Sequence, residues 1–156
     1  MKTFDYSLVK DPQYFKDRRM DAHSDHTYYR DGEEAQEKAT SFRYDLNGIW
    51  KFHYARNYGS AIPGFEKADY CCKDWDDIRV PAHIQMEGYD APQYANVQYP
   101  WEGHEDIHPG EIPEHFNPVA SYVKYFEVPE EMQGKRLFIL FREQRAALHY
   151  GSTDSL

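Results

Sequence analysis

The sequence has little cysteine: Cys71 and Cys72 are adjacent, and there are no others. Neighbouring residues rarely bridge each other, and two cysteines do not make a disulfide framework. The N-terminus lacks the apolar core of a secretory signal. No segment approaches the length of a transmembrane helix. These absences predict a soluble protein of a reducing, cytoplasmic compartment, without a membrane partner.

Positive charge is also scarce, because 18 Lys and Arg stand against 27 Asp and Glu, for a formal net charge of −9. Nucleic acids and anionic membranes bind basic surfaces, so neither is expected as a partner. The length of 156 residues favours a single domain. Aromatic residues, by contrast, reach 17% of the chain. They supply contact area in binding sites, but they also fill the cores of β-sandwiches.

The common catalytic signatures are missing: there is no glycine-rich phosphate loop, no G-x-S-x-G and no C-x-x-C. Carboxylate neighbours such as Asp76 and Asp77 do not face each other across a sugar, as glycosidase chemistry requires. Two clusters of histidine and acidic residues could bind a metal. For the first we favour a polar turn that docks the arm, because metal sites usually draw a third or fourth ligand from elsewhere. For the second we favour a solvated loop, because no helix or strand fixes its spacing. The clusters are His23, Asp25 and His26, and His104, Glu105, Asp106, His108 and Glu111.

Alternating and apolar stretches predict a few β-strands and no strong amphipathic helix. Residues 1–42 are charged and tyrosine-rich, and we expect an extended arm with a short helix near 31–38, lying across a larger body or a neighbouring subunit. Residues 82–119 lack periodicity and predict one long loop. This pattern suits an antiparallel sandwich or jelly roll with too few strands to be complete. The expected strands are 43–56, 74–80, 120–128 and 136–141.

Residues 88–101, G-Y-D-A-P-Q-Y-A-N-V-Q-Y-P-W, form the most distinctive part of that loop. Aromatic faces stack on sugar rings, and amide side chains bond sugar hydroxyls. For most of the aromatic residues we favour the simpler interpretation that they pin the loop to the sheet. For Asn96 both interpretations stay open. The residues with sugar-binding chemistry are Tyr89, Tyr94, Asn96, Tyr99 and Trp101.

Three stretches carry a resemblance to a known domain: L-N-G-I-W-K-F (46–52), W-D-D-I-R-V-P-A-H-I-Q-M-E-G-Y-D-A-P-Q-Y-A-N-V-Q-Y-P (75–100) and N-P-V-A-S-Y-V-K-Y-F-E-V-P (117–129). They resemble the N-terminal sugar-binding domain of the large bacterial β-galactosidases of glycoside hydrolase family 2. A-H-S-D-H near the start is similar to the arm of that family. The most specific block is Q-M-x-G-Y-D-A-P-x-Y-x-N-V-x-Y-P.

The resemblance implies an all-β, galactose-binding-domain-like jelly roll packed against a TIM barrel that carries two catalytic glutamates. It implies hydrolysis of terminal non-reducing β-D-galactose residues, as in lactose, with retention. Full-length relatives are expected to use Mg²⁺ and Na⁺ and to be homo-oligomers that the arm helps to assemble. Asn96 matches the asparagine that reaches into the barrel's active site and touches the galactose.

The departures from the family pattern predict an incomplete protein. The barrel is absent, together with both catalytic glutamates and the metal ligands, and so is the second half of the sugar-binding domain. We therefore expect an arm at 1–42, an incomplete jelly-roll β-sandwich at 43–141 and an unrelated tail at 142–156. The chain is expected to be an inactive fragment of a glycosidase. The alternatives are a non-catalytic galactoside-binding module and a fragment that complements a barrel-bearing chain.

The tail R-E-Q-R-A-A-L-H-Y-G-S-T-D-S-L predicts a single-nucleotide deletion. Back-translation with permitted codons, with one T restored before the Phe141 codon, gives F-Q-G-A-E-S-R-F-A-L-W-L-N-G-Q-L, which is the family pattern. We expect the DNA across this locus to show that continuation when it is sequenced. An intact upstream frame with no L-W-x-N-G downstream in any frame would contradict the prediction.

Overall fold

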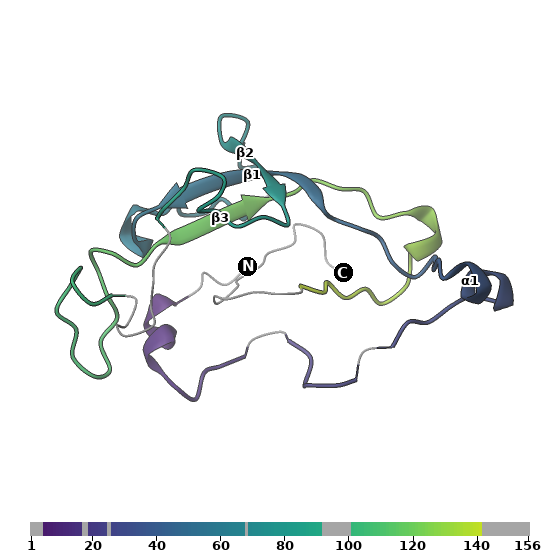
Figure 1. Ribbon diagram of the computed structural model, residues 1–156, viewed down its shortest axis with the longest axis horizontal. Helices are drawn as coiled ribbons and strands as arrows, with labels where there is room; N and C mark the ends of the chain where they lie inside the picture. The colour runs from purple at the N-terminus through teal and green to yellow at the C-terminus, as the bar shows by residue number, and fades with distance from the viewer. Residues whose placement is uncertain (1–4, 17–18, 25, 68, 92–100, 142–156) are drawn as a thin grey trace.

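The computed structural model describes residues 5–16, 19–24, 26–67, 69–91 and 101–141. Its centre is one antiparallel sheet of three strands in the order β2-β1-β3 (Figure 1). The strands are β1 (Gly48–Ala55), β2 (Asp76–Val80) and β3 (Val119–Val123). The helices are all short: η1 (Tyr6–Lys10), α1 (Gly32–Glu37), η2 (Tyr58–Ser60) and η3 (Glu130–Met132). None of these helices has the length and apolar character to cross a membrane.

One face of β1 carries the aromatic core. Phe52 is fully buried, and the rings of Tyr89 and Tyr122 pack edge-on against it, with centroids 4.5 and 4.9 Å away. The register places Phe52 opposite Tyr122 of β3 and Trp50 opposite Ile78 of β2. Ile78 is only 2% exposed. Because side chains alternate along a strand, the period-2 pattern of β1 delivers these apolar groups to one face.

The opposite face of the sheet is covered by the connection between β1 and β2. The ring of Trp75 lies 5.4 Å from that of His53, and its indole Nε1 donates to the Tyr70 hydroxyl at 3.1 Å. Cys72 is buried in this layer, and its Sγ lies 3.6 Å from the hydroxyl of Tyr125. Both faces of β1 are therefore packed, and on this second face the covering segment is the irregular connection between β1 and β2.

The start of the arm packs on its own domain. The ring of Tyr6 in η1 stacks on that of Tyr58 with centroids 3.9 Å apart and planes 3° from parallel. Asn117 Nδ2 donates to the Tyr6 hydroxyl at 3.0 Å. From η1 the described arm runs along the length of the molecule to α1 (Figure 1). The start of the arm thus contacts its own sheet domain through Tyr6; the expectation that the arm as a whole lies across a larger body or a neighbouring subunit stays a prediction.

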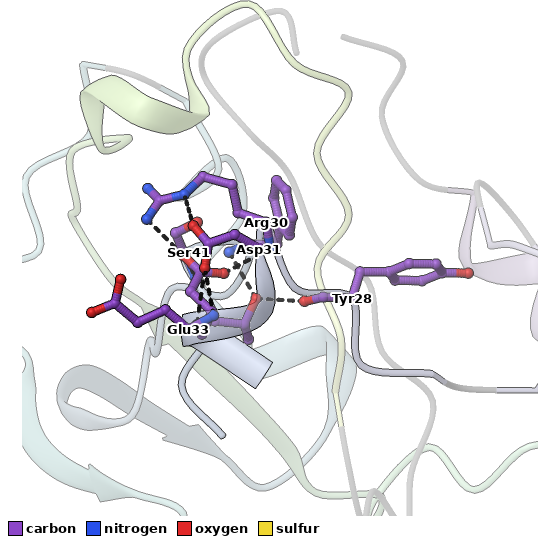
Figure 2. Close-up of polar contacts among 8 residues, drawn as sticks. Tyr28, Arg30, Asp31, Glu33 and Ser41 are labelled. Carbon is purple, nitrogen blue, oxygen red and sulfur yellow. Dashed lines mark hydrogen bonds and ion pairs between the residues drawn. The ribbon is translucent and has the colours of Figure 1, made fainter. Parts of the chain in front are cut away.

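The short helix expected near residues 31–38 is confirmed as α1. Asp31 caps it by accepting the backbone N–H groups of Glu33 and Glu34 at 3.1 and 3.0 Å. Glu34 accepts the Arg30 N–H at 2.8 Å, and its carboxylate also bonds the Ser41 N–H at 3.3 Å. Figure 2 shows this polar group, in which an N-cap and the chain on either side of the helix are held together.

Three of the four expected strands are confirmed, in shortened form. The strand expected at 136–141 is wrong: this stretch has no regular structure, and Phe138 and Leu140 are 57% and 62% exposed. An extended segment becomes a strand only when a neighbour pairs with its backbone groups, and no described strand does so. The described chain is β-rich with few helices; a jelly roll, which needs a second sheet, stays a prediction.

Replacing Phe52 by Ala should remove the centre of the aromatic face. We expect F52A to lower the free energy of unfolding by about 3–5 kcal/mol, a large share of the stability of a small domain. I49A is the matched control, since Ile49 lies on the same strand but is 57% exposed, and it should cost no more than about 0.5 kcal/mol. Denaturant titration of the 156-residue chain measures both; equal losses would contradict this account of the core.

Candidate functional site

The predicted sugar contact, Asn96, and its neighbours Tyr94 and Tyr99 fall at 92–100 and lie outside the described residues. The two flanking aromatic residues of that stretch, Tyr89 and Trp101, are described. The structure therefore shows how each end of the stretch is fixed to the sheet.

The near end is a compact turn over residues 83–89. Met86 N donates to the His83 carbonyl at 2.9 Å, and Tyr89 N donates to the Ile84 carbonyl at 3.0 Å. Gly88 makes the turn possible with φ of 94°, a conformation that favours glycine. The turn brings the chain back over β1 and β2 just before the candidate loop.

Tyr89 ties this turn to the sheet with its side chain. Its ring packs on Phe52, and its hydroxyl donates to Asp76 Oδ2, on the first residue of β2, at 2.8 Å. Burial, followed by the bond to the Asp76 carboxylate, raises the pKa of Tyr89 to about 12. The phenol therefore stays a protonated donor throughout the neutral range. As expected for most aromatic residues of this stretch, its role is to pin the loop.

Asp90 follows in a left-handed backbone conformation with φ of 60°. Its Oδ1 accepts the N–H of Ala91 at 2.8 Å. Burial, together with the Asp90 carboxylate, raises the pKa of Tyr54 on β1. Tyr89 thus contacts both β1 and β2 two residues before the described chain is interrupted at 92–100.

The far end is organised by Glu105. Gly103, with φ of 83°, forms a turn in which the Trp101 carbonyl accepts the N–H of His104 at 3.0 Å. The Glu105 carboxylate accepts the backbone N–H groups of residues 114, 115 and 116 at 2.9, 3.0 and 3.4 Å. The Nδ1 of His115 also lies 2.9 Å from it. These bonds, led by the Glu114 N–H and then by His115, lower the pKa of Glu105 to about 2.

The segment that Glu105 holds is itself fixed to the end of β1. Asn117 N donates to the Arg56 carbonyl at 3.0 Å, and Asn57 Nδ2 donates to the His115 carbonyl at 3.2 Å. The ring of Phe116 stacks on His104 with centroids 4.2 Å apart. Both ends of the 92–100 stretch are therefore attached to one strand, the near end beside Phe52 and Tyr54 and the far end beyond Ala55.

The histidine and acidic clusters behave as turns where they are described. Glu111 Oε2 accepts the His108 N–H at 2.9 Å, and Glu105 is engaged by the backbone. His23 Nδ1 lies 2.8 Å from the Asp21 carbonyl, while Asp25 is outside the described residues. Within the described part of the chain, no group of three or more His, Cys, Asp and Glu side chains is placed to hold a metal ion.

Three residues hold the loop in a role that was not predicted for them from the sequence. Asp76 could be found only from the register that brings β2 beside β1. Asp90 carried a weak signal, since aspartate within two residues of both a glycine and a proline is typical of turns. Glu105 was noticed, but as part of a possible metal cluster. A carboxylate that accepts hydrogen bonds from N–H groups nine to eleven residues later has no local sequence signature.

Comparison with known proteins gives the family. The glycosyl hydrolases family 2 sugar binding domain matches residues 43–150. The chain is 49% identical over 151 residues to a β-galactosidase of Halalkalibacterium halodurans, covering 96% of this chain and 15% of that protein. It is 40% identical to β-galactosidases of Streptococcus thermophilus and Clostridium acetobutylicum, covering 87% and 90% of this chain but 13% and 16% of theirs.

The chain belongs to glycoside hydrolase family 2, in which it corresponds to the sugar-binding domain. It spans between 13% and 24% of the length of the curated relatives it matches. The family match extends to residue 150, past the predicted change of frame at 142. The tail at 142–156 lies outside the described residues, and its reading frame stays a prediction.

The lowered pKa of Glu105 predicts how the 105–116 loop responds to acid. Because its folded pKa is depressed, it stabilises the 105–116 loop fully above the ordinary value of 4.5, and this stabilisation is lost as the pH falls toward about 2. Amide hydrogen exchange at residues 114–116 should therefore accelerate on acidification, relative to the intrinsic rate, in the natural chain. In E105Q, amide exchange at residues 114–116 should be fast both above pH 4.5 and near pH 2. E102Q, an exposed neighbour in the same turn, is the control; an unchanged pH dependence in E105Q would refute the assignment.

Proposed function

We propose that this chain supplies part of the sugar-binding domain of a β-galactosidase that hydrolyses terminal non-reducing β-D-galactose residues, in lactose-type substrates, with retention. The observation that carries the proposal is the match of residues 43–150 to the sugar-binding domain of family 2. β-Galactosidases of three bacteria support it, since each aligns with at least 87% of the chain.

Within this domain, Asn96 is the proposed substrate contact. The support is its place in a stretch whose two ends are built into the sheet domain, by Tyr89 on one side and by the Glu105 turn on the other. An amide offers both a donor and an acceptor to sugar hydroxyls.

The 156 residues are proposed to be inactive alone. Retaining hydrolysis needs two carboxyl groups about 5 Å apart across the glycosidic bond. By resemblance, those glutamates belong to a barrel that follows the sugar-binding domain, and this domain holds no catalytic residue. Its contribution is to bind and orient the galactose.

The proposed full-length enzyme is a cytoplasmic homo-oligomer that uses Mg²⁺ and Na⁺. The free thiols of Cys71 and Cys72 support a reducing compartment. Within the described residues, no group of three or more His, Cys, Asp and Glu side chains is placed to hold a metal ion, and the proposal of these two ions rests on the family resemblance alone. We assign them no step here.

A second candidate function is a non-catalytic galactoside-binding module. The observation that favours it is that the family match is to the sugar-binding domain. A lactose titration of the isolated chain that shows binding dependent on Asn96 would support this reading over the first.

The leading proposal is tested with a chimera. Residues 1–141 replace the aligned segment of the Halalkalibacterium halodurans β-galactosidase, whose own chain continues from there. The chimera should hydrolyse o-nitrophenyl β-D-galactopyranoside, and N96A should lower its kcat/KM roughly tenfold, as expected for a lost hydrogen bond to an uncharged hydroxyl.

Two controls accompany this experiment. The isolated chain should release no galactose, and Q98A changes a neighbouring amide in the same stretch and should leave kcat/KM within about twofold of the chimera. Galactose release by the isolated chain would overturn the proposed inactivity. A folded chimera in which N96A and Q98A behave alike would overturn the assignment of Asn96.

A further inference from the structure

Residues 136–140, near the end of the described chain, carry a run of exposed apolar side chains. Phe138, Ile139 and Leu140 are 57%, 38% and 62% exposed, although they follow one another in the sequence. Three consecutive side chains do not share one face of a chain, so the domain covers neither face of this segment. Figure 1 shows it, in yellow, running apart from the three strands. Single exposed apolar residues are ordinary, but a consecutive run is expected where it serves a contact.

The segment leaves the domain from a fixed base. Met132 of η3 is buried, and its carbonyl accepts the N–H of Lys135 at 3.3 Å. The Lys135 Nζ lies 5.2 Å from the centroid of the Phe42 ring, just before β1, and the Arg136 guanidinium lies 5.0 Å from that of Phe138. The apolar run is therefore presented from a defined place on the molecule.

Each copy of the chain also carries an acceptor for such a segment. The strand order β2-β1-β3 leaves the outer sides of β2 and β3 without a strand neighbour in the described chain. An unpaired edge is a template on which another chain can add a strand. We propose that two copies of this chain pair, each laying its 136–140 segment along the open edge of β2 in the other copy. This pairing goes beyond the proposed function and is independent of the role of Asn96.

Charge favours a second copy as the occupant and β2 as the edge. Arg136 leads into the apolar run, whereas the whole chain has a formal net charge of −9. Strand β2 exposes Asp76 and Asp77 beside Arg79, and Asp77 pairs within its own copy only with the exposed end of Lys51, at 2.9 Å. Strand β3 contains no carboxylate. The basic start of one segment therefore meets the acidic edge of the other copy.

The exposed area favours a reciprocal contact over a single one. Large apolar side chains present roughly 150–250 Å² each, so Phe138, Ile139 and Leu140 at their exposed fractions present on the order of 300 Å². One contact, with an equal area covered on the other copy, buries about 600 Å², the size of a crystal-packing contact. Two reciprocal contacts bury about 1,200 Å², which reaches the range of specific interfaces. The arrangement is therefore a two-fold, self-complementary dimer.

The test is the mass of the 156-residue chain in sedimentation equilibrium. At about 100 μM, above the micromolar dissociation constants of the weaker interfaces of this size, the chain should have twice its monomer mass of 18.5 kDa. F138E places a charge in the middle of the segment and should raise the dissociation constant at least tenfold. F15E is the matched control, because Phe15 lies on the arm and is 71% exposed, and it should leave the dimer intact.

Further variants test how the segment pairs. I139P keeps an apolar side chain but removes a backbone N–H and restricts the chain, so it should weaken a strand-paired dimer about as much as F138E does. R136E should also weaken the dimer, and adding D77R to the same chain should recover most of the loss. All these positions are exposed, so far-UV circular dichroism should show an unchanged fold in every variant.

The remaining outcomes would overturn the proposal. A natural chain that is monomeric at this concentration contradicts it, and so does a dimer that survives F138E. A dimer that F15E dissociates would be held together by the arm instead. Assemblies larger than a dimer would contradict the two-fold arrangement, and a dimer unaffected by I139P or R136E would contradict pairing at the β2 edge. None of these results bears on Asn96, which the chimera tests separately.

Discussion

The packing of Tyr89 and Tyr122 against Phe52 is the contact on which the rest of the structure depends. It joins the three strands on one face, because Phe52 belongs to β1, Tyr122 lies opposite it in β3, and the Tyr89 hydroxyl bonds the first residue of β2. The same contact holds the turn that leads into the 92–100 stretch. Core packing and the anchoring of that turn are therefore one arrangement, built around a fully buried side chain.

The sequence predicted the parts of the fold that are set by local patterns. Alternation around Phe52 identified β1, and the short helix expected near residues 31–38 is α1. The prediction of a strand at 136–141 failed, because this apolar run has strand character but no strand of the described chain pairs with it. A β-strand needs a neighbouring strand to pair with its backbone groups, and the residue pattern of one segment does not show whether that neighbour exists.

The candidate site, too, could be predicted from the sequence only in part. The sequence drew attention to Tyr89, Asn96 and Trp101 through their composition and through a family resemblance that the comparison confirms. It could not reveal Asp76 as the partner of Tyr89, because that pair depends on the register between strands. Nor could it show that Glu105 serves the backbone of residues 114–116, since carboxylates in acidic loops have many possible partners.

The bond between Asn117 and Tyr6 joins residues 111 positions apart. At about 5–20 residues per second, a ribosome needs on the order of ten seconds to make the chain between them. Throughout that interval the arm has no Asn117 to bind, and β1 has no β3 beside it. A nascent chain stopped before residue 117 could therefore stack Tyr6 on Tyr58, but it would lack the hydrogen bond that completes the docking of the arm.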